Sequence, residues 1–119
     1  MNKFEIIGNL TSDIKLEQTK DGIDVTRFTL AINMGKDKDG NRKTNYIDLS
    51  AWRSTAKLLS DYSKKGDKLF VCGHIQPREQ TQYTQEGKEF KDIDMTLIVD
   101  EIEFLSPRKN EEKDSTKEK

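Results

Sequence analysis

The sequence predicts a small all-β domain, a barrel of five strands with one helix between the third and the fourth. Apolar residues alternate with polar ones along most of the chain, which is the period of a half-buried strand. Only one short segment, residues 54–65, has helical spacing. The chain has 119 residues, 32% apolar and 36% charged, enough for one domain with one small core.

The first two strands are expected at residues 3–10 and 23–34. The first ends in Gly8-Asn9-Leu10, and a polar stretch with a turn at Asp21-Gly22 separates it from the second. In the second strand the alternation is regular. It places Phe28, Leu30 and Ile32 on the core face and Arg27, Thr29, Ala31 and Asn33 on the other.

A hairpin loop is expected at residues 35–43, where Gly, Asp and Asn supply turn chemistry within a polar run. The third strand, residues 44–52, resumes the alternation. Its inward positions are Ile47, Leu49 and Ala51, and its outward positions are Tyr46, Asp48, Ser50 and Trp52.

The helix is expected at residues 54–65, with Ser54 as its N-cap and Gly66 ending it. Lys64 and Lys65 fall in its expected last turn. Its apolar side consists of Ala56, Leu59 and Tyr62, with Leu58 beside them.

The fourth strand is expected at residues 68–76, with Leu69, Val71, Gly73 and Ile75 on one face. Pro77 weakens pairing beyond it. Residues 78–91 suggest an extended hairpin that turns at Glu86-Gly87, and residues 92–105 form the last strand. Its in-phase residues are Ile93, Met95, Leu97 and Val99.

Five strands with one helix in this position are the order of an OB-fold, a Greek-key barrel. The expected domain covers residues 1–105. Residues 106–119 contain no apolar residue after Pro107 and are expected to form a disordered polar tail.

The composition argues against several classes of function. One Cys and one His allow no disulfide framework and no usual metal set, so neither a metal nor a cofactor is expected. No nucleophile–base pair is apparent, and the acids of residues 92–103 alternate with core positions as on a solvated strand face, so the chain is not expected to be an enzyme. Without a long apolar run or a signal peptide, no membrane partner is expected, and the expected location is the cytoplasm, with the nucleoid.

Two aromatic residues stand on the polar face of the third strand. Tyr46 and Trp52 are six positions apart, so they share the face of Asp48 and Ser50. Exposed rings on a polar face suggest a stacking platform for unpaired bases. A subunit interface, or packing beneath a loop, is the alternative explanation.

Basic residues surround this pair on the second strand, on the two hairpins and next to Trp52. Cations that follow phosphates, interleaved with rings that take bases, are what a groove for a single strand needs. The basic residues are Arg27, Lys36, Lys38, Arg42, Lys43, Arg53, Arg78, Lys88 and Lys91, and the second hairpin adds the rings of Tyr83 and Phe90.

The segments that carry these residues resemble the bacterial single-stranded DNA-binding protein (SSB) family, over about residues 2–106. The resemblance rests on five motifs in the family's order. They are Ile7-Gly8-Asn9-Leu10, Arg27 to Asn33, Trp52 to Ala56 leading to Lys64-Lys65-Gly66-Asp67, Val71 to Ile75, and Ile102 to Leu105.

The resemblance implies roles for individual residues. Tyr46 and Trp52 match rings that stack on bases, Met34 matches a position often held by such a ring, and Tyr83 is the nearest match in the second hairpin. Arg27, Thr29 and Arg53 match the binding face. The family usually forms homotetramers, although a dimer is possible, and the residues expected at subunit contacts are Lys3, Phe4, Glu5, Ile47, Phe70 and His74.

The implied function is sequence-independent binding and protection of single-stranded DNA in replication, recombination or repair. Two alternatives remain open: an adaptor of the primosome type that binds replication proteins first and DNA second, and an RNA-binding OB-fold. The family generally ends in an acidic run closed by Pro-Phe, whereas this sequence ends in Lys117-Glu118-Lys119. Recruitment of replication proteins through the tail is therefore not expected.

Overall fold

The computed structural model describes residues 1–85 and 87–106, and the side chains of residues 78–85 and 88–94 lie outside that description. The expected disordered tail, residues 106–119, falls outside it except for Ser106. Along the described chain the elements are β1 (Phe4–Leu10), β2 (Glu17–Gln18), β3 (Asp24–Lys36), β4 (Arg42–Trp52), α1 (Arg53–Tyr62), β5 (Lys68–Gln85) and β6 (Lys88–Phe104).

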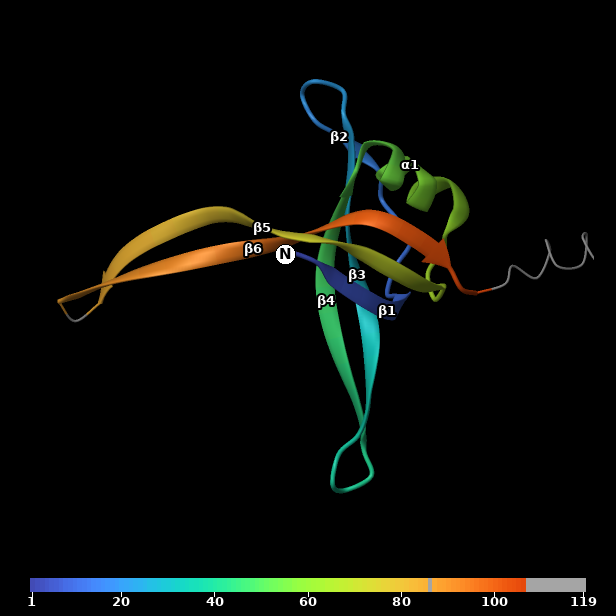
Figure 1. Ribbon diagram of the computed structural model, residues 1–119, viewed down its shortest axis with the longest axis horizontal. Coiled ribbons are helices and arrows are strands. Elements are labelled where there is room, and N and C mark those ends of the chain that lie inside the picture. The colour runs from blue at the N-terminus through green and yellow to red at the C-terminus, as the bar shows by residue number, and fades with distance from the viewer. Residues whose placement is uncertain (86, 107–119) are drawn as a thin grey trace, which may run out of the picture.

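Five of these strands close into a barrel, which confirms the predicted fold class. The order around it is β1-β5-β6-β4-β3, and β3 pairs again with β1. Neighbours are antiparallel except β4 and β6, which run parallel at Ser50 and Ala51. The short β2, which the sequence did not predict, pairs with the edge of β3. Two long hairpins, β3–β4 and β5–β6, project from the barrel in different directions (Figure 1).

The core is small and comes from the alternating positions of the five barrel strands. Leu30, Ala51, Leu69 and Val71 are inaccessible to solvent, and Leu49 is nearly so. Helix α1 packs against β3, β4 and β6 and adds Ala56 and Leu59. Apolar burial of this kind is the main force that holds the domain together.

The helix is shorter than the sequence suggested. It begins at Arg53, so Ser54 lies inside the first turn and is not the N-cap. It ends at Tyr62, where the Ser63 backbone N–H donates to the Leu59 carbonyl at 3.1 Å. Gly66 therefore does not end the helix. Its φ of +93° turns the chain into β5, and its N–H donates to the Leu10 carbonyl at 2.9 Å.

The two longest strands depart from the predicted alternation. Ile75 and Met95, both assigned to the core face, are 37% and 56% exposed, because at these points β5 and β6 leave the barrel and continue as a hairpin. A bulge at Asp100 lets Val99 and Ile102, three positions apart, both pack on the core. Cys72, predicted on the outward face, is only 9% exposed.

The turns agree better with the sequence. Asp21-Gly22 forms the expected turn, with the Gly22 N–H donating to the Thr19 carbonyl at 2.9 Å. The second hairpin pairs without interruption from Glu79 with Asp94 to Gln85 with Lys88, around the predicted turn at Gly87. None of the described helical segments is long and apolar enough to cross a membrane.

Candidate nucleic-acid interface

The outward face of the β3–β4 sheet carries a row of directly paired residues. Val25 pairs with Trp52, Arg27 with Ser50, Thr29 with Asp48, and Ala31 with Tyr46. Residues opposite one another in antiparallel strands share a face. The pairing therefore brings the predicted rings and two of the predicted polar contacts onto one surface.

Both predicted stacking residues of β4 are open to solvent. Tyr46 is 67% exposed and Trp52 is 40% exposed. They are six positions apart along the strand, or about 20 Å at the usual rise. Such a spacing leaves room for other groups between the two rings.

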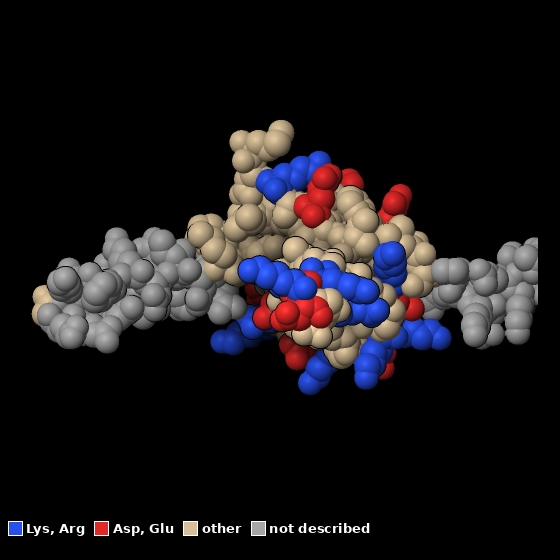
Figure 2. All heavy atoms as spheres, turned by 90° about the horizontal axis from the view of Figure 1, so that it is seen from below, with Lys and Arg blue, Asp and Glu red and all other residues tan. Residues whose placement is uncertain are grey.

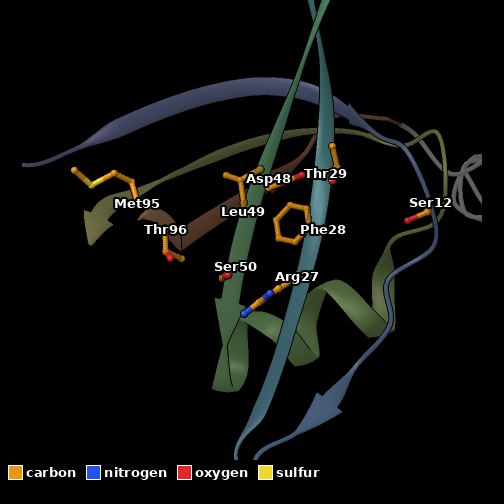
Figure 3. Close-up of a pocket in the computed structure, with 9 residues that line it drawn as sticks. All are labelled: Ser12, Arg27, Phe28, Thr29, Asp48, Leu49, Ser50, Met95 and Thr96. Atoms are coloured by element: carbon orange, nitrogen blue, oxygen red, sulfur yellow. Dashed lines mark hydrogen bonds between the residues drawn. The ribbon is translucent and has the colours of Figure 1, made fainter. Parts of the chain in front are cut away.

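A groove lies on this surface; Trp52 lines it, whereas Tyr46 does not. It consists of two adjoining cavities of about 470 and 480 Å³ that share Arg27, Ser50 and Thr96. The first extends from Ser12 across β3 and β4 to Met95 on β6 (Figure 3). The second contains Trp52 and reaches Glu17, Gln76 and Pro77. We call the two cavities together the groove.

The polar side chains of the groove lie at the centre of the sheet. Figure 3 shows Arg27 directed toward Ser50 and Thr29 directed toward Asp48. The Thr29 hydroxyl donates to Asp48 Oδ1 at 2.6 Å. Ser50, predicted to be an outward residue, is only 7% exposed, because β6 pairs with β4 at this position. The sequence pattern alone could not show that crossing.

The junction between β4 and α1 holds a residue in the left-handed region. Arg53 has a φ of +57°, the only positive value of a non-glycine residue in the described chain. A side chain in this conformation costs about 1–2 kcal/mol. The exposed Arg53 directly follows Trp52, which lines the second cavity of the groove.

The tip of the β3–β4 hairpin carries four predicted cations. Lys36 pairs with Arg42 in the ladder, and Lys36, Lys38, Arg42 and Lys43 are all exposed. Asp37 shapes the tip, because its Oδ1 accepts from the backbone N–H groups of Asp39 and Asn41, each at 2.9 Å. In Figure 2, which looks up at the hairpin tip, basic atoms surround a small acidic group.

Met34 lies on β3 near the tip of the β3–β4 hairpin. It is 52% exposed, but it continues the alternation of Leu30 and Ile32, whereas Tyr46 is opposite Ala31. A register shift follows Asn33, so the hairpin is irregular at this point. Alternation across this shift does not fix the face of Met34, so its role in stacking stays a prediction.

Five predicted residues lie on the β5–β6 hairpin, and their side chains fall outside the described part of the structure. These are Arg78, Tyr83, Lys88, Phe90 and Lys91. Their backbone register is described: Tyr83 pairs with Phe90, Gln82 with Lys91, and Gln85 with Lys88. Tyr83 and Phe90 are therefore directly opposite, a relation that the sequence left open.

Five of the six residues predicted at subunit contacts lie on or next to β1 and β5, and the sixth, Ile47, lies on β4. Lys3 pairs with Glu5 at 3.7 Å, and His74 Nδ1 lies 2.9 Å from Asp100 Oδ2. Phe70 is half-buried and opposite Ile7, which is 48% exposed. Ile7 is thus an outward apolar residue that the sequence analysis missed.

Two other predicted contact residues are turned toward the core. Phe4 and Ile47 are both partly buried and pack against the core cluster. For Ile47 this agrees with its inward position in the alternation. For Phe4 the pairing of β1 with β5 explains it, since Phe4 and Ile6 occupy the inward positions of β1.

The single cysteine lies on the same side of the barrel. Burial raises the pKa of the Cys72 thiol, and the nearby Glu101 carboxylate raises it further. Its sulfur lies 3.8 Å from Glu101 Oε1. Among the described side chains, no three His, Cys, Asp or Glu residues come together in a group that could hold a metal ion.

Comparison with known proteins identifies the family of the chain. The single-strand binding protein family matches residues 1–105. A single-stranded DNA-binding protein of Bacillus cereus is 34% identical over 110 residues, which cover 91% of this chain and 62% of that protein. Single-stranded DNA-binding protein 1 of Streptococcus pyogenes is 32% identical over 92% of this chain and 82% of its own length. The chain thus spans about three fifths of the Bacillus relative, and it belongs to the single-strand binding protein family.

Proposed function

We propose that this chain binds single-stranded DNA without sequence specificity and protects it during replication, recombination or repair, in the cytoplasm at the nucleoid. The observation that carries the proposal is the exposure of Tyr46 and Trp52 on one face of β4, at 67% and 40%. Rings of this kind stack on any base, at about 1–3 kcal/mol per base. The names of the relatives support the same ligand.

The cations supply the second half of the argument. Arg27 lies in the groove, Arg53 lies beside Trp52, and the hairpin tip adds four exposed basic residues. Phosphates that run along such a path release counterions, which makes binding depend on salt. Arg78, Lys88 and Lys91, with Tyr83 and Phe90, would extend the same path along the second hairpin.

The test uses the chain's only tryptophan. Titration with oligo(dT) should quench Trp52 fluorescence, because a base stacked on the indole changes its environment. The affinity should fall as salt rises. An unchanged signal at low salt would contradict stacking on Trp52.

Substitution of the rings separates stacking from attraction by charge. Tyr46→Ala and Trp52→Ala should each weaken binding by about 1–3 kcal/mol, measured by anisotropy of a labelled oligonucleotide. Tyr62→Ala is the matched control, because Tyr62 is 52% exposed on α1 and contacts Phe104 instead of the groove. Equal losses in all three variants would argue for a general effect on folding.

The same titration distinguishes the alternatives. An affinity for oligo(dT) weaker than about 10 µM at physiological salt is ordinary non-specific binding, and it would favour the protein adaptor. Tighter binding of oligo(U) than of oligo(dT) would favour an RNA ligand.

We further propose that the chain assembles as a homotetramer through the β1–β5 side of the barrel. The exposed Ile7 and the half-buried Phe70 give this side an apolar centre, with charged residues around it. Lys3, Glu5 and His74 lie at its edge, whereas Phe4 and Ile47 would support it from the core side. Light scattering should give four times the mass of the chain, and a mass of one chain would exclude this assembly.

A further inference from the structure

The groove contains a carboxylate, although the ligand proposed for it is a polyanion. Asp48 lies on β4 between Tyr46 and Trp52, on the same face, and its exposed side chain lines the groove. A carboxylate repels phosphates, so it weakens sequence-independent binding wherever the backbone of the strand passes. Asp48 therefore needs a different kind of partner on the ligand.

Asp48 is held in place by its neighbour across the sheet. The Thr29 hydroxyl donates to Asp48 Oδ1 at 2.6 Å, the short distance of a charge-assisted hydrogen bond. Thr29 is fixed in turn, because its carbonyl accepts from both the backbone N–H and the hydroxyl of Thr11, each at 3.2 Å. The carboxylate is thus oriented before any ligand arrives.

Most hydrogen-bond acceptor sites of the Asp48 carboxylate are unoccupied within the described part of the chain. A carboxylate has two oxygens and about four acceptor sites, and Thr29 uses one of them. Asp48 Oδ2 has no hydrogen-bond partner, and neither Asp48 nor Arg27 belongs to an ion pair, within the described part of the chain. The Asp48 side chain lines the groove (Figure 3).

The bases of a bound strand are the groups that can donate to this oxygen. A strand stacked on Tyr46 and Trp52 turns its bases toward the sheet, so their edges pass over the residues between the rings. Cytosine presents an N4 amino group, a recognised donor to Asp and Glu. Uracil and thymine present a carbonyl at that position, and their N3–H lies between two carbonyl oxygens that repel a carboxylate.

We propose that Asp48 adds a modest base preference to otherwise sequence-independent binding: it accepts a hydrogen bond from an amino-bearing base, so that the groove favours cytosine over uracil. Thr29 acts as the positioning residue for the carboxylate. The inference rests on the proposed function, since it requires a strand in the groove.

The test compares oligo(dC) with oligo(dU) of equal length at pH 8, by competition for the wild-type protein. The two bases differ at position 4 and in the protonation of N3, and neither carries a methyl group. The wild type should bind oligo(dC) tighter by about fivefold or more, the range for one good base contact. In Asp48→Asn the ratio should fall to near one, because a carboxamide both donates and accepts.

Two further variants separate base recognition from charge and from folding. Asp21→Asn removes one negative charge from an exposed turn outside the groove, and it should leave the dC/dU ratio at the wild-type value. Thr29→Val keeps the carboxylate but removes its donor, and it should lower the ratio partway.

The outcomes are distinct. A wild type that binds oligo(dU) as tightly as oligo(dC), or an Asp48→Asn variant that keeps the wild-type ratio, overturns the role of Asp48 while single-strand binding stands. Failure of the wild type to bind either strand overturns the proposed function and this inference with it.

Discussion

At the scale of single residues, Arg53 combines backbone strain with a positive charge next to Trp52. Its φ of +57° lies in the left-handed region, where a residue with a Cβ is disfavoured. A non-glycine residue in this conformation is more common at functional sites than elsewhere. The strain at Arg53 lowers stability, and a role in binding beside Trp52 is a reason for the chain to keep it.

Replacement of Arg53 should separate its two effects. Arg53→Gly should raise the free energy of unfolding by about 1 kcal/mol, because glycine tolerates this conformation, while binding of oligo(dT) becomes weaker. Urea denaturation and anisotropy measure the two quantities. Arg53→Ala is the control, since it removes the cation and keeps the strain. An equal stability for the Gly and Ala variants would show that the strain costs nothing measurable.

Sequence reasoning identified the exposed residues of the site better than its enclosed ones. Tyr46 and Trp52 were predictable because residues an even number of positions apart share one face of a strand, and here that face is polar. The burial of Ser50 was not, since it depends on β6 crossing beside β4. The bond between Thr29 and Asp48 was also missed, because it joins residues 19 positions apart and depends on the register of two strands.

At the scale of elements, Gly73 marks a close approach of β5 to the backbone of β6. A Cβ at this position would overlap the carbonyl oxygen of Ile98 on β6. The bulge at Asp100 lies directly next to this contact, where Cys72 pairs with Glu101 and Gly73 with Val99. The close approach and the bulge together bend the two strands out of the barrel and into the hairpin.

Gly73→Ala should therefore destabilise the domain strongly. We expect a loss of about 3 kcal/mol in the free energy of unfolding, because the obstructing atom belongs to the backbone and cannot rotate away. Denaturation in urea measures the loss. Gly8→Ala is the comparison, since its Cβ would lie 2.9 Å from the Ala31 carbonyl oxygen and should cost less. The reverse order of the two variants would contradict this account of the bend.

The same bend limited what the sequence could predict about the elements. Strand order, helix position and both hairpins followed from alternation and turn residues, and the structure confirms them. The faces of β5 and β6 did not follow, since alternation assumes a strand that stays on one barrel. Ile75 and Met95 therefore looked like core residues, although they lie where the hairpin has left the core.

At the scale of the whole molecule, the charge is nearly balanced, and its distribution matters more than its sum. Residues 1–105 contain 16 Lys and Arg and 18 Asp and Glu, so no general positive field attracts a polyanion. Attraction must come from local groups, above all the hairpin tip, where four cations surround two acids (Figure 2). Stacking then carries a larger share of the affinity than it would on a uniformly basic surface.

The salt dependence of binding tests this division. Each phosphate neutralised on a single strand contributes about 0.7 to the slope of log affinity against log salt. The double variant Lys36→Ala with Lys38→Ala should therefore reduce the slope by about 1.4 if both cations contact phosphates. The matched control is Lys64→Ala with Lys65→Ala, two exposed lysines that follow α1 and lie outside the groove and the tip. An equal change in both double variants would mean that net charge, and not the hairpin tip, governs the attraction.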